Sequence, residues 1–338
     1  MKKIAALLIA ALCALQLSAQ KKDISFNSNG ELRILQLTDL HLQIEKPQEH
    51  DKSLGRIDHI IKAEKPDFIA ITGDVVTGDR ETRVQMWDKV LAFLDSYKIP
   101  YAIAYGNHDA EGSMTRPEMS QNIIKKGKYC VNTLNDKGEL ADIRIPVKPS
   151  DRKSGADPLD IYMLDSHDYP HKQGYEEGKY GKYAWFKFDQ ICWFRQQCEA
   201  ATAANGGVNV PSLVFFHIPL REFNEAYANG AIGTKGESGG ESMINAGMFC
   251  AMLETGNTMG VFVGHDHDDT YITSHYGIAL GYGGFSGDDT TYNHLAHGLR
   301  VIVVKEGQRS FRTWIHEEDD RIEYPVEYTD GVISKIKL

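Results

Sequence analysis

Five short polar motifs in this chain carry side chains that can bind metal ions, and each motif follows a short apolar run. Carboxylate and amide oxygens and neutral imidazole nitrogens are donors that divalent transition metals accept in proteins. The apolar runs cover residues 34–37, 68–71, 101–104, 213–216 and 261–263, and such runs are typical of buried strands. In chain order the motifs are Asp39-Leu40-His41, Gly73-Asp74, Gly106-Asn107-His108-Asp109, the isolated His217, and Gly264-His265-Asp266-His267.

The spacing inside two of these motifs places both donors on one side of the chain. Asp39 and His41 are separated by one residue, and so are His265 and His267. Residues i and i+2 of an extended segment share a face, so each pair can point at one ion. Glycine before Asp74 removes the side chain that would crowd a carboxylate shared by two ions. The sequence therefore predicts a two-metal site where strands end and loops begin.

The segments between the motifs predict the elements that position them. Apolar residues at helical spacing predict helices over residues 51–63, 81–97, 188–203 and 241–254, and a strand is expected over 67–72. The alternation of strands and helices at the start implies parallel strands with crossover helices. Residues 110–182 have a looser pattern, with strands expected near 142–147 and 159–164, and are interpreted as an insertion. Short β-runs over 259–316, ending in 299–304 and 310–315, predict a second, more antiparallel sheet.

The ordered motifs resemble those of the calcineurin-like metallophosphoesterase superfamily, which read DxH, GD, GNH followed by an acid, H, and GHxH. The resemblance covers roughly residues 30–316. It implies an α/β fold, a four-layer α-β-β-α sandwich of two mixed β-sheets flanked by helices. It also implies a catalytic domain over residues 28–318, with 110–182 as a substrate-region insertion and 319–338 as a C-terminal extension.

The resemblance also implies a role for each motif residue. One ion would be bound by Asp39, His41, Asp74 and His267, and the other by Asp74, Asn107, His217 and His265, so that Asp74 is shared. His108 matches the catalytic histidine that the family holds outside the metal ligands. Asp109 matches the acidic residue that orients this histidine.

A narrower resemblance, carried by residues 215–220, 261–268 and 313–315, is to the purple-acid-phosphatase-related branch. This branch includes a yeast cell-cycle-regulator phosphatase and plant homologues. True purple acid phosphatases have a tyrosine three residues after the shared aspartate, and this chain has Thr77 there. Because the phenolate that favours ferric iron is absent and His41 offers an imidazole, the expected cofactor is two divalent or mixed-valence ions of manganese, zinc or iron.

The implied reaction is hydrolysis of phosphate esters, with monoesters favoured by the narrower resemblance. Phosphodiesters of nucleotides or lipid headgroups are the alternative. Two ions about 3.5 to 4 Å apart can bind one bridging water and lower its pKa, which makes hydroxide the expected nucleophile. His108 is expected to protonate the leaving alkoxide or to stabilise charge on the phosphoryl group.

Further residues are candidates for substrate contact or for another chemistry. His167 follows an expected strand, Tyr282 lies in the glycine-rich segment 281–287, and Arg116 could contact phosphate. Residues 236–240 match the GxSxG elbow of serine hydrolases around Ser238, but the glycine-rich residues before it do not predict the strand that an elbow needs. A phosphate-binding protein without catalysis is a third class, and the presence of His108 argues against it.

The first 19 residues have the features of a secretory signal peptide. Lys2 and Lys3 precede the apolar residues 4–17, and Leu17-Ser18-Ala19 is a plausible cleavage site. A membrane anchor is the alternative, but the apolar stretch is short for a span of about 20 residues. The protein is therefore expected to be periplasmic or secreted, without stable membrane insertion after cleavage.

Composition limits the partners of the remaining chain. The 338 residues are 42% hydrophobic and 25% charged, as in ordinary globular proteins, and the formal net charge is −10. Removal of Lys2 and Lys3 with no acid changes this charge to −12. Nucleic acid is therefore not an expected partner, whereas a small phosphate ester is; the oligomeric state is open.

The four cysteines that follow the signal segment allow three disulfide pairings, which are not distinguished by the sequence. The pair Cys192 and Cys198 is excluded, because six residues of helix at ~1.5 Å each separate them by about 9 Å. The set is Cys130, Cys192, Cys198 and Cys250.

Overall fold

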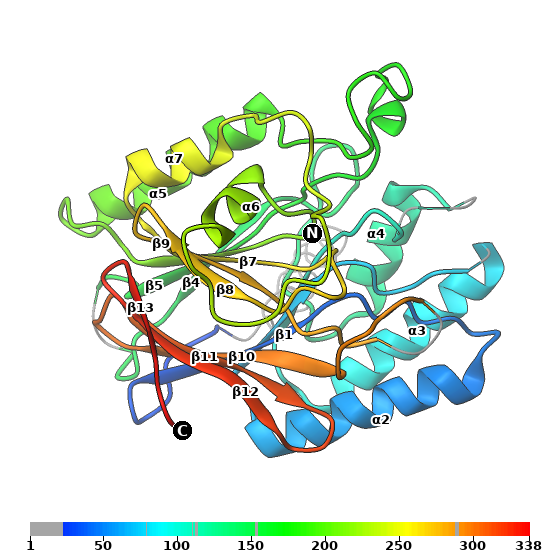
Figure 1. Cartoon of the computed structure of the whole chain (residues 1–338), viewed down its shortest axis with the longest axis horizontal. Coiled ribbons are helices and arrows are strands. Elements are labelled where there is room, and N and C mark those ends of the chain that lie inside the picture. Colours follow the sequence, from blue (N-terminus) through cyan, green and yellow to red (C-terminus); the bar gives the residue numbers. More distant parts are fainter. Residues whose placement is uncertain (1–22, 79, 110, 112–113, 153–154, 288–290) are drawn as a thin grey trace, which may run out of the picture.

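Two mixed β-sheets pack face to face between two layers of helices in the computed structural model of the chain (Figure 1). The structure describes residues 23–338 except 79, 110, 112, 113, 153, 154 and 288–290. The expected signal peptide, residues 1–19, therefore lies outside the described residues. In the described part, no helix is both long enough and apolar enough to cross a membrane.

The first sheet has seven strands in the order β13-β12-β11-β10-β1-β2-β3. Helix α2 (Pro47–Glu64) connects β1 to β2 and helix α3 (Arg80–Ser96) connects β2 to β3, so these three strands run parallel, as predicted. The other four strands continue the sheet in antiparallel fashion from β1. The strands are β1 Glu31–Leu37, β2 Phe68–Thr72, β3 Tyr101–Ala104, β10 Gly298–Lys305, β11 Ser310–Glu317, β12 Ile322–Thr329 and β13 Val332–Lys335.

The second sheet has six strands in the order β4-β5-β6-β7-β9-β8. Its four inner strands are parallel, and the two edge strands β4 and β8 are antiparallel to their neighbours. The strands are β4 Ile143–Val147, β5 Leu159–Met163, β6 Ser212–Phe215, β7 Thr258–Val263, β8 Ile272–His275 and β9 Ile278–Tyr282.

Three apolar layers hold the sandwich together. The first lies between the seven-stranded sheet and helices α2, α3 and α4, the second between the two sheets, and the third between the six-stranded sheet and helices α5, α6 and α7 (Figure 1). The strands that precede the motifs, β1, β2, β3, β6 and β7, are buried along most or all of their length, which explains why these runs are continuously apolar. The remaining helices are α4 Arg116–Lys126, α5 Phe188–Ala204, α6 Arg221–Tyr227 and α7 Met248–Thr255, with a short 3₁₀ helix, η1, at Pro170–Gln173.

The structure differs from the sequence-based expectation in how segments join the sheets. Residues 110–182, expected as an insertion, supply β4 and β5 to the six-stranded sheet, and β5 pairs with β6. Strands β10 and β11, expected in a second sheet, extend the first sheet because β10 pairs with residues 31–36 of β1. Residues 319–338, expected as an extension, form β12 and β13 of that same sheet.

Helix α7 is shorter than the helix expected over residues 241–254, because it begins only at Met248. The preceding residues make contacts elsewhere in the fold: the Ser242 hydroxyl donates to the Tyr183 carbonyl at 3.2 Å. A Cβ on Gly240 would lie 2.5 Å from Nε2 of His265, so the backbone of this segment touches a motif histidine. Gly247 then takes a left-handed conformation with φ of 88° immediately before the helix.

All four described cysteines carry free thiols. Cys130 and Cys198 are buried, and Cys250 is exposed.

Candidate dinuclear metal centre

The five motifs meet at one place because each of them follows the carboxyl end of a parallel strand. The first three follow β1, β2 and β3 of the seven-stranded sheet, and the last two follow β6 and β7 of the six-stranded sheet. The two sheets are joined directly beside this place by Gln36 on β1, whose Nε2 donates to the Val263 carbonyl of β7 at 3.0 Å. The site is thus assembled from both sheets.

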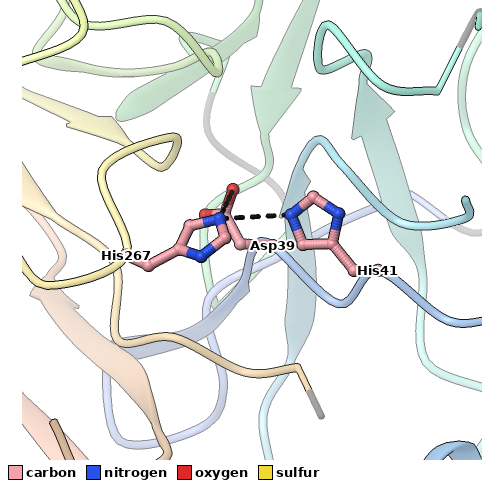
Figure 2. A group of neighbouring side chains, drawn as sticks. All are labelled: Asp39, His41 and His267. Atoms are coloured by element: carbon pink, nitrogen blue, oxygen red, sulfur yellow. Dashed lines mark hydrogen bonds and ion pairs between the residues drawn. The ribbon is translucent and has the colours of Figure 1, made fainter. Parts of the chain in front are cut away.

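Asp39, His41 and His267 form one buried group of donor atoms (Figure 2). Nε2 of His41 lies 3.1 Å from Nε2 of His267, and Nε2 of His267 lies 3.6 Å from Oδ1 of Asp39. The donor atoms of the three residues all lie within 4.8 Å of one another. One cation can therefore contact all three side chains.

Asp74, His217 and His265 form a second buried group of the same kind. Nε2 of His217 lies 3.2 Å from Oδ2 of Asp74 and 3.2 Å from Nδ1 of His265. Oδ1 of Asn107 is also 3.2 Å from Nε2 of His217, so the amide oxygen joins this group.

Asp74 lies between the two groups. Its Oδ2, 3.2 Å from His217 in the second group, is only 3.7 Å from Nε2 of His41 in the first. Its other oxygen, Oδ1, accepts a hydrogen bond of 2.8 Å from the backbone N–H of His108. A carboxylate held in this way can be shared by two cations.

Four of the ligand candidates have backbone conformations that L-residues adopt rarely. The φ angles are 55° at Asp39, 47° at His41, 52° at Asp74 and 80° at His265. A left-handed non-glycine residue costs roughly 1 to 3 kcal/mol and persists where its surroundings hold it in place. Backbone hydrogen bonds from Asp39 N to the Gly73 carbonyl and from His41 N to the Asp74 carbonyl bind the first two motif loops together.

The glycines that precede the ligands are required by close approaches. A Cβ on Gly73 would lie 2.7 Å from Nδ1 of His217, and one on Gly106 would lie 2.7 Å from Cγ of Asp74. A Cβ on Gly264 would lie 2.6 Å from Oδ2 of Asp39. Such distances are far shorter than ordinary contacts between carbon atoms and their neighbours. Only the absence of a side chain at each glycine allows its loop to lie against a ligand candidate from another motif.

Backbone carbonyls orient two of the imidazoles. Nδ1 of His217 donates to the Thr72 carbonyl at 2.7 Å, and Nδ1 of His267 donates to the Tyr292 carbonyl at 2.6 Å. Because a carbonyl only accepts, Nδ1 carries the proton in each ring and Nε2 is left to face the donor group. Metal-binding histidines are commonly fixed by such a bond.

The protonation of three ligands suits cation binding, whereas two imidazoles must lose a proton when a cation binds. Burial opposes ionisation of Asp39, but the bond to His267 and the charges of His217 and His267 lower its pKa to about 2. Burial lowers the pKa of His41 to about 4, with repulsion from His267 adding to this, and burial together with repulsion from His217 lowers that of His265 to about 3. At neutral pH Asp39 is therefore an anion, and His41 and His265 are neutral bases. Burial lowers the pKa of His217 and His267, but the carboxylates of Asp74 and Asp39 outweigh this effect and raise both, that of His217 to about 10.

These observations fit two divalent cations of the kinds expected from the sequence. The donors are buried carboxylate oxygens, imidazole nitrogens and one amide oxygen, a mixture that suits zinc, manganese or iron more than calcium or magnesium. Thr77, at the position of the purple-enzyme tyrosine, donates its hydroxyl to the His41 carbonyl at 3.1 Å and so supports the His41 loop.

His108 lies beside the two groups without belonging to either. Its ring centroid is 5.4 Å from that of His41, and 39% of its side chain is exposed. Nδ1 of His108 is 2.7 Å from Oε2 of Glu111. Burial lowers the pKa of His108, but the bond to Glu111 and the charge of Asp74 outweigh this effect, so the pKa is raised.

The expected role of Asp109 is corrected by its contacts. Its buried carboxylate accepts backbone hydrogen bonds of 2.8 Å each from Asp74, Val75 and Gly106. The described partner of the His108 ring is Glu111 instead, so Asp109 shapes the loop that carries Asp74. In the sequence, Glu111 is marked only as an acidic residue three positions after His108. It lies outside the motifs.

The three residues proposed for substrate contact are engaged elsewhere. Tyr282 is fully buried, and its hydroxyl donates to Oδ2 of Asp266 at 2.8 Å. Nη2 of Arg116 is 2.5 Å from Oδ2 of Asp165 in a largely buried ion pair. Nε2 of His167 is 2.7 Å from Oε1 of Gln190. Tyr282 and Arg116 are therefore not open to substrate, and the ring of His167 is bonded to Gln190 of α5.

Three tyrosines that the sequence analysis did not single out border the ligands. Tyr292 stacks on His267 with ring centroids 4.3 Å apart, and Tyr183 meets His265 edge-on at 4.4 Å. The hydroxyl of Tyr169 accepts from Nδ2 of Asn107 at 3.0 Å. No motif surrounds these tyrosines in the sequence, so only their position in the fold reveals them.

The serine-hydrolase alternative at Ser238 lacks its structural context. In the described residues, Ser238 follows isolated bridges and bends rather than a strand, and the next helix begins at Met248. A nucleophile elbow needs a sharp turn between a strand and a helix. Ser238 is therefore not placed as a catalytic nucleophile.

Comparison with known proteins places this centre in a family. The model of the calcineurin-like phosphoesterase family matches residues 32–269, which include every ligand candidate. The probable inactive purple acid phosphatase 29 of Arabidopsis thaliana is 28% identical, over 93% of this chain and 90% of its own length. Phosphatase DCR2 of Saccharomyces cerevisiae is 26% identical, over 84% of this chain and 53% of its own length.

Two solved structures show the same fold. A dimetal phosphatase from Danio rerio aligns with a TM-score of 0.59 at 12% identity, over 88% of this chain and 99% of its own. A purple acid phosphatase from yellow lupin aligns with a TM-score of 0.56 at 11% identity, over 89% of this chain and 54% of its own. The fold class expected from the motifs is confirmed, and the chain belongs to the calcineurin-like phosphoesterase family.

Proposed function

We propose that this protein is a dinuclear-metal hydrolase of phosphate monoesters that works outside the cytoplasm. The observation that carries the proposal is the position of Asp74. One of its carboxylate oxygens faces both donor groups, and the other holds the backbone of His108. A cation pair and a proton donor would thereby have a fixed position relative to each other.

The residues divide the work of such a reaction. The first donor group with Asp74 would hold one cation, and Asp74 with Asn107, His217 and His265 would hold the other. Two divalent cations supply Lewis-acid charge for phosphoryl oxygens and make water nucleophilic at neutral pH. Burial of the ligands keeps bulk water from screening that charge.

His108 is the proton donor in this proposal. Its pKa is raised, so the ring carries its second proton at neutral pH more often than a free histidine does. With 39% of its side chain exposed, the ring would be accessible to an oxygen atom of a substrate bound at the metal centre. Transfer of that proton to the leaving alkoxide completes cleavage of the ester bond, work typically worth roughly 10² to 10⁴ in rate.

The Arabidopsis relative is named as a probable inactive purple acid phosphatase. In this chain, both donor groups are complete and His108 is present with a carboxylate partner. These features support activity rather than a binding function.

Metal analysis followed by a substrate panel tests the proposal. The protein is purified without chelator, its manganese, zinc and iron are measured, and phosphate monoesters and diesters are compared. We expect about two ions per chain and faster hydrolysis of monoesters. Asp74→Asn should lose metal and activity together, because it weakens the shared ligand.

The proposal fails if neither ester class is hydrolysed by fully metal-loaded protein. Faster hydrolysis of diesters would leave the dinuclear hydrolase in place and replace the substrate class. Activity that survives exhaustive chelation would exclude a metal-dependent reaction altogether.

The location outside the cytoplasm rests on residues 1–19, whose basic start and apolar stretch favour export. Mass spectrometry of the mature protein from fractionated cells tests it. We expect a new N-terminus close after Ala19 in the periplasmic or secreted fraction. An intact N-terminus in the cytoplasmic fraction would contradict this expectation.

A further inference from the structure

A chain of three hydrogen bonds connects a metal-ligand candidate to the proposed proton donor. It runs from Asn107 to Tyr169, from Tyr169 to Glu111, and from Glu111 to His108. Tyr169 and Glu111 lie in none of the family motifs of this chain. Tyr169 comes from the loop after β5, so the connection spans the two sheets.

The first bond decides which end of the Asn107 amide faces the centre. An amide has one oxygen that accepts and one nitrogen that donates, and their similar shapes allow either to point inward. Nδ2 of Asn107 donates to the Tyr169 hydroxyl at 3.0 Å, which directs Oδ1 toward Nε2 of His217 at 3.2 Å. The reverse orientation would present N–H groups to a cation.

The second and third bonds use both oxygens of one carboxylate. The Tyr169 hydroxyl donates to Oε1 of Glu111 at 2.8 Å, and Nδ1 of His108 lies 2.7 Å from Oε2. A hydroxyl has one proton and two lone pairs. Because the proton goes to Glu111, a lone pair remains for Asn107, and the directions of all three bonds agree.

The loop that carries Tyr169 is held in place independently of these bonds. The backbone N–H of Tyr169 donates to Oδ1 of the buried Asp168 at 2.8 Å, and Nε2 of Gln173 donates to the same oxygen at 3.1 Å. Nη1 of Arg116 is 3.7 Å from Oδ2 of Asp168. Arg116 thus fixes this loop to the start of α4.

We propose that Tyr169 and Glu111 are positioning residues that orient Asn107 for the metal and His108 for the substrate as one unit. The part that concerns His108 rests on the proposed function, whereas the part that concerns Asn107 rests only on the metal centre. Neither residue touches the reacting atoms in this proposal. Each acts through the group that it holds.

Metal affinity tests the Asn107 part without any turnover. Titration calorimetry with Mn²⁺ on the metal-free full chain compares the wild type with Tyr169→Phe. Loss of a group that orients a ligand typically costs roughly 10- to 100-fold in metal affinity, and we expect a loss of that size for one of the two Mn²⁺ binding events. Tyr175→Phe is the matched control, because it removes a phenol hydroxyl from the same segment at a tyrosine that packs on Tyr180 and Trp185.

Substitution of Asn107 distinguishes a loss of amide orientation from a general disturbance of the metal centre. A carboxylate presents an oxygen in either orientation, so Asn107→Asp has no need of Tyr169. Tyr169→Phe should therefore change Mn²⁺ affinity less than about twofold in the Asn107→Asp background, although it weakens affinity in the wild type. An equal loss in both backgrounds would overturn the orienting role, and so would an unchanged affinity of Tyr169→Phe.

Kinetics tests the His108 part. Glutamine at position 111 keeps the shape but offers one acceptor oxygen instead of two. Glu111→Gln should lower kcat at least tenfold on whichever ester the wild type hydrolyses, with KM and Mn²⁺ affinity within about threefold of the wild type. An unchanged kcat would overturn this part. If the wild type hydrolyses no ester, the proposed function fails, and the affinity results still decide the Asn107 part.

Discussion

At the scale of single residues, each polar group in this centre has a neighbour that determines what it can do. His217 and His267 present Nε2 because backbone carbonyls accept from Nδ1. Asp109, which belongs to a motif, acts on backbone amides, while Glu111, outside every motif, contacts the imidazole of His108. The residue types in the motifs thus predict the ligand candidates. The roles of the residues around them, such as Asp109 and Glu111, follow only from contacts in the folded structure.

Replacing His108 by alanine should separate catalysis from metal binding. His108 lies outside both donor groups, so His108→Ala should keep the metal content of the wild type. Loss of the proton donor should lower kcat by roughly 10² to 10⁴. Metal analysis and steady-state kinetics on the same sample measure both quantities.

His59→Ala is the matched control, since His59 is a half-exposed histidine on α2 that pairs with Asp320. It should leave metal content and kcat unchanged. Loss of metal from His108→Ala would instead make His108 a ligand.

Replacing Gly106 by alanine should damage the metal centre through one methyl group. The new Cβ would lie 2.7 Å from Cγ of Asp74, so the shared carboxylate would have to move. We expect Gly106→Ala to lose bound metal, as measured by metal analysis of the folded protein. Gly155→Ala, where no atom lies within 4 Å of the added Cβ, should keep it. Full metal content in Gly106→Ala would show that the loops tolerate the shift.

The substrate residues show the limit of prediction from sequence at this scale. Tyr282 was a candidate because glycines surround it, yet β9 places it in the core, where its hydroxyl bonds Asp266. Arg116 was a candidate for its charge, yet Asp165 and Asp168 already neutralise it. Neither the burial nor the ion pairs could be inferred locally, because the partners lie far along the chain.

At the scale of elements, strands were easier to predict than their pairing. Apolar runs identified the strands before the motifs because a strand buried on both faces has a continuous apolar pattern. Pairing of β10 with β1 joins residues at opposite ends of the chain, and no local pattern encodes it. Strands β4 and β5 were found near their true bounds, but the polar residues around them hid their place within a sheet.

Helix α2 contains a glycine, Gly55, at a position where the structure does not require one. Gly55 is exposed, and no atom lies within 4 Å of an added Cβ. Because alanine has the higher helix propensity, Gly55→Ala should raise the free energy of unfolding by about 0.5 to 1 kcal/mol. Urea denaturation measures this change.

Gly30→Ala provides the contrast, because Gly30 has a φ of 69° that alanine adopts at a cost. It should lower the free energy of unfolding. A decrease for Gly55→Ala as well would mean that this helix surface has contacts that the structure does not indicate.

At the scale of the whole molecule, an ion pair links helix α2 to strand β11 of the seven-stranded sheet. Nδ1 of His316 on β11 is 2.6 Å from Oε1 of Glu64, the last residue of α2. The bond to Glu64 raises the pKa of His316 although burial opposes it, and Asp320 adds to the rise. Arg33 also contacts Glu64, and His59 contacts Asp320, so acids and bases surround the pair.

This pair should make stability depend on pH above neutrality. Because the folded pKa of His316 exceeds its ordinary value of 6.5, its stabilisation is complete below pH 6.5 and is lost as pH rises through the folded pKa. The difference in free energy of unfolding between wild type and His316→Gln should therefore shrink from about pH 6 to about pH 9. Urea denaturation across that range measures it. A constant difference would mean that His316 contributes through packing alone.

Because the ligand candidates come from two sheets, they are also made at different times during synthesis of the chain. Asp39, His41, Asp74 and Asn107 leave the ribosome long before His217, and His265 and His267 come later still. Neither donor group is complete until β7 has been made and has paired with β6. A nascent chain therefore has no full set of ligands for any cation. A cation that needs a full donor group would therefore be bound only after most of the chain has been made, and would come from the compartment where the chain finishes folding.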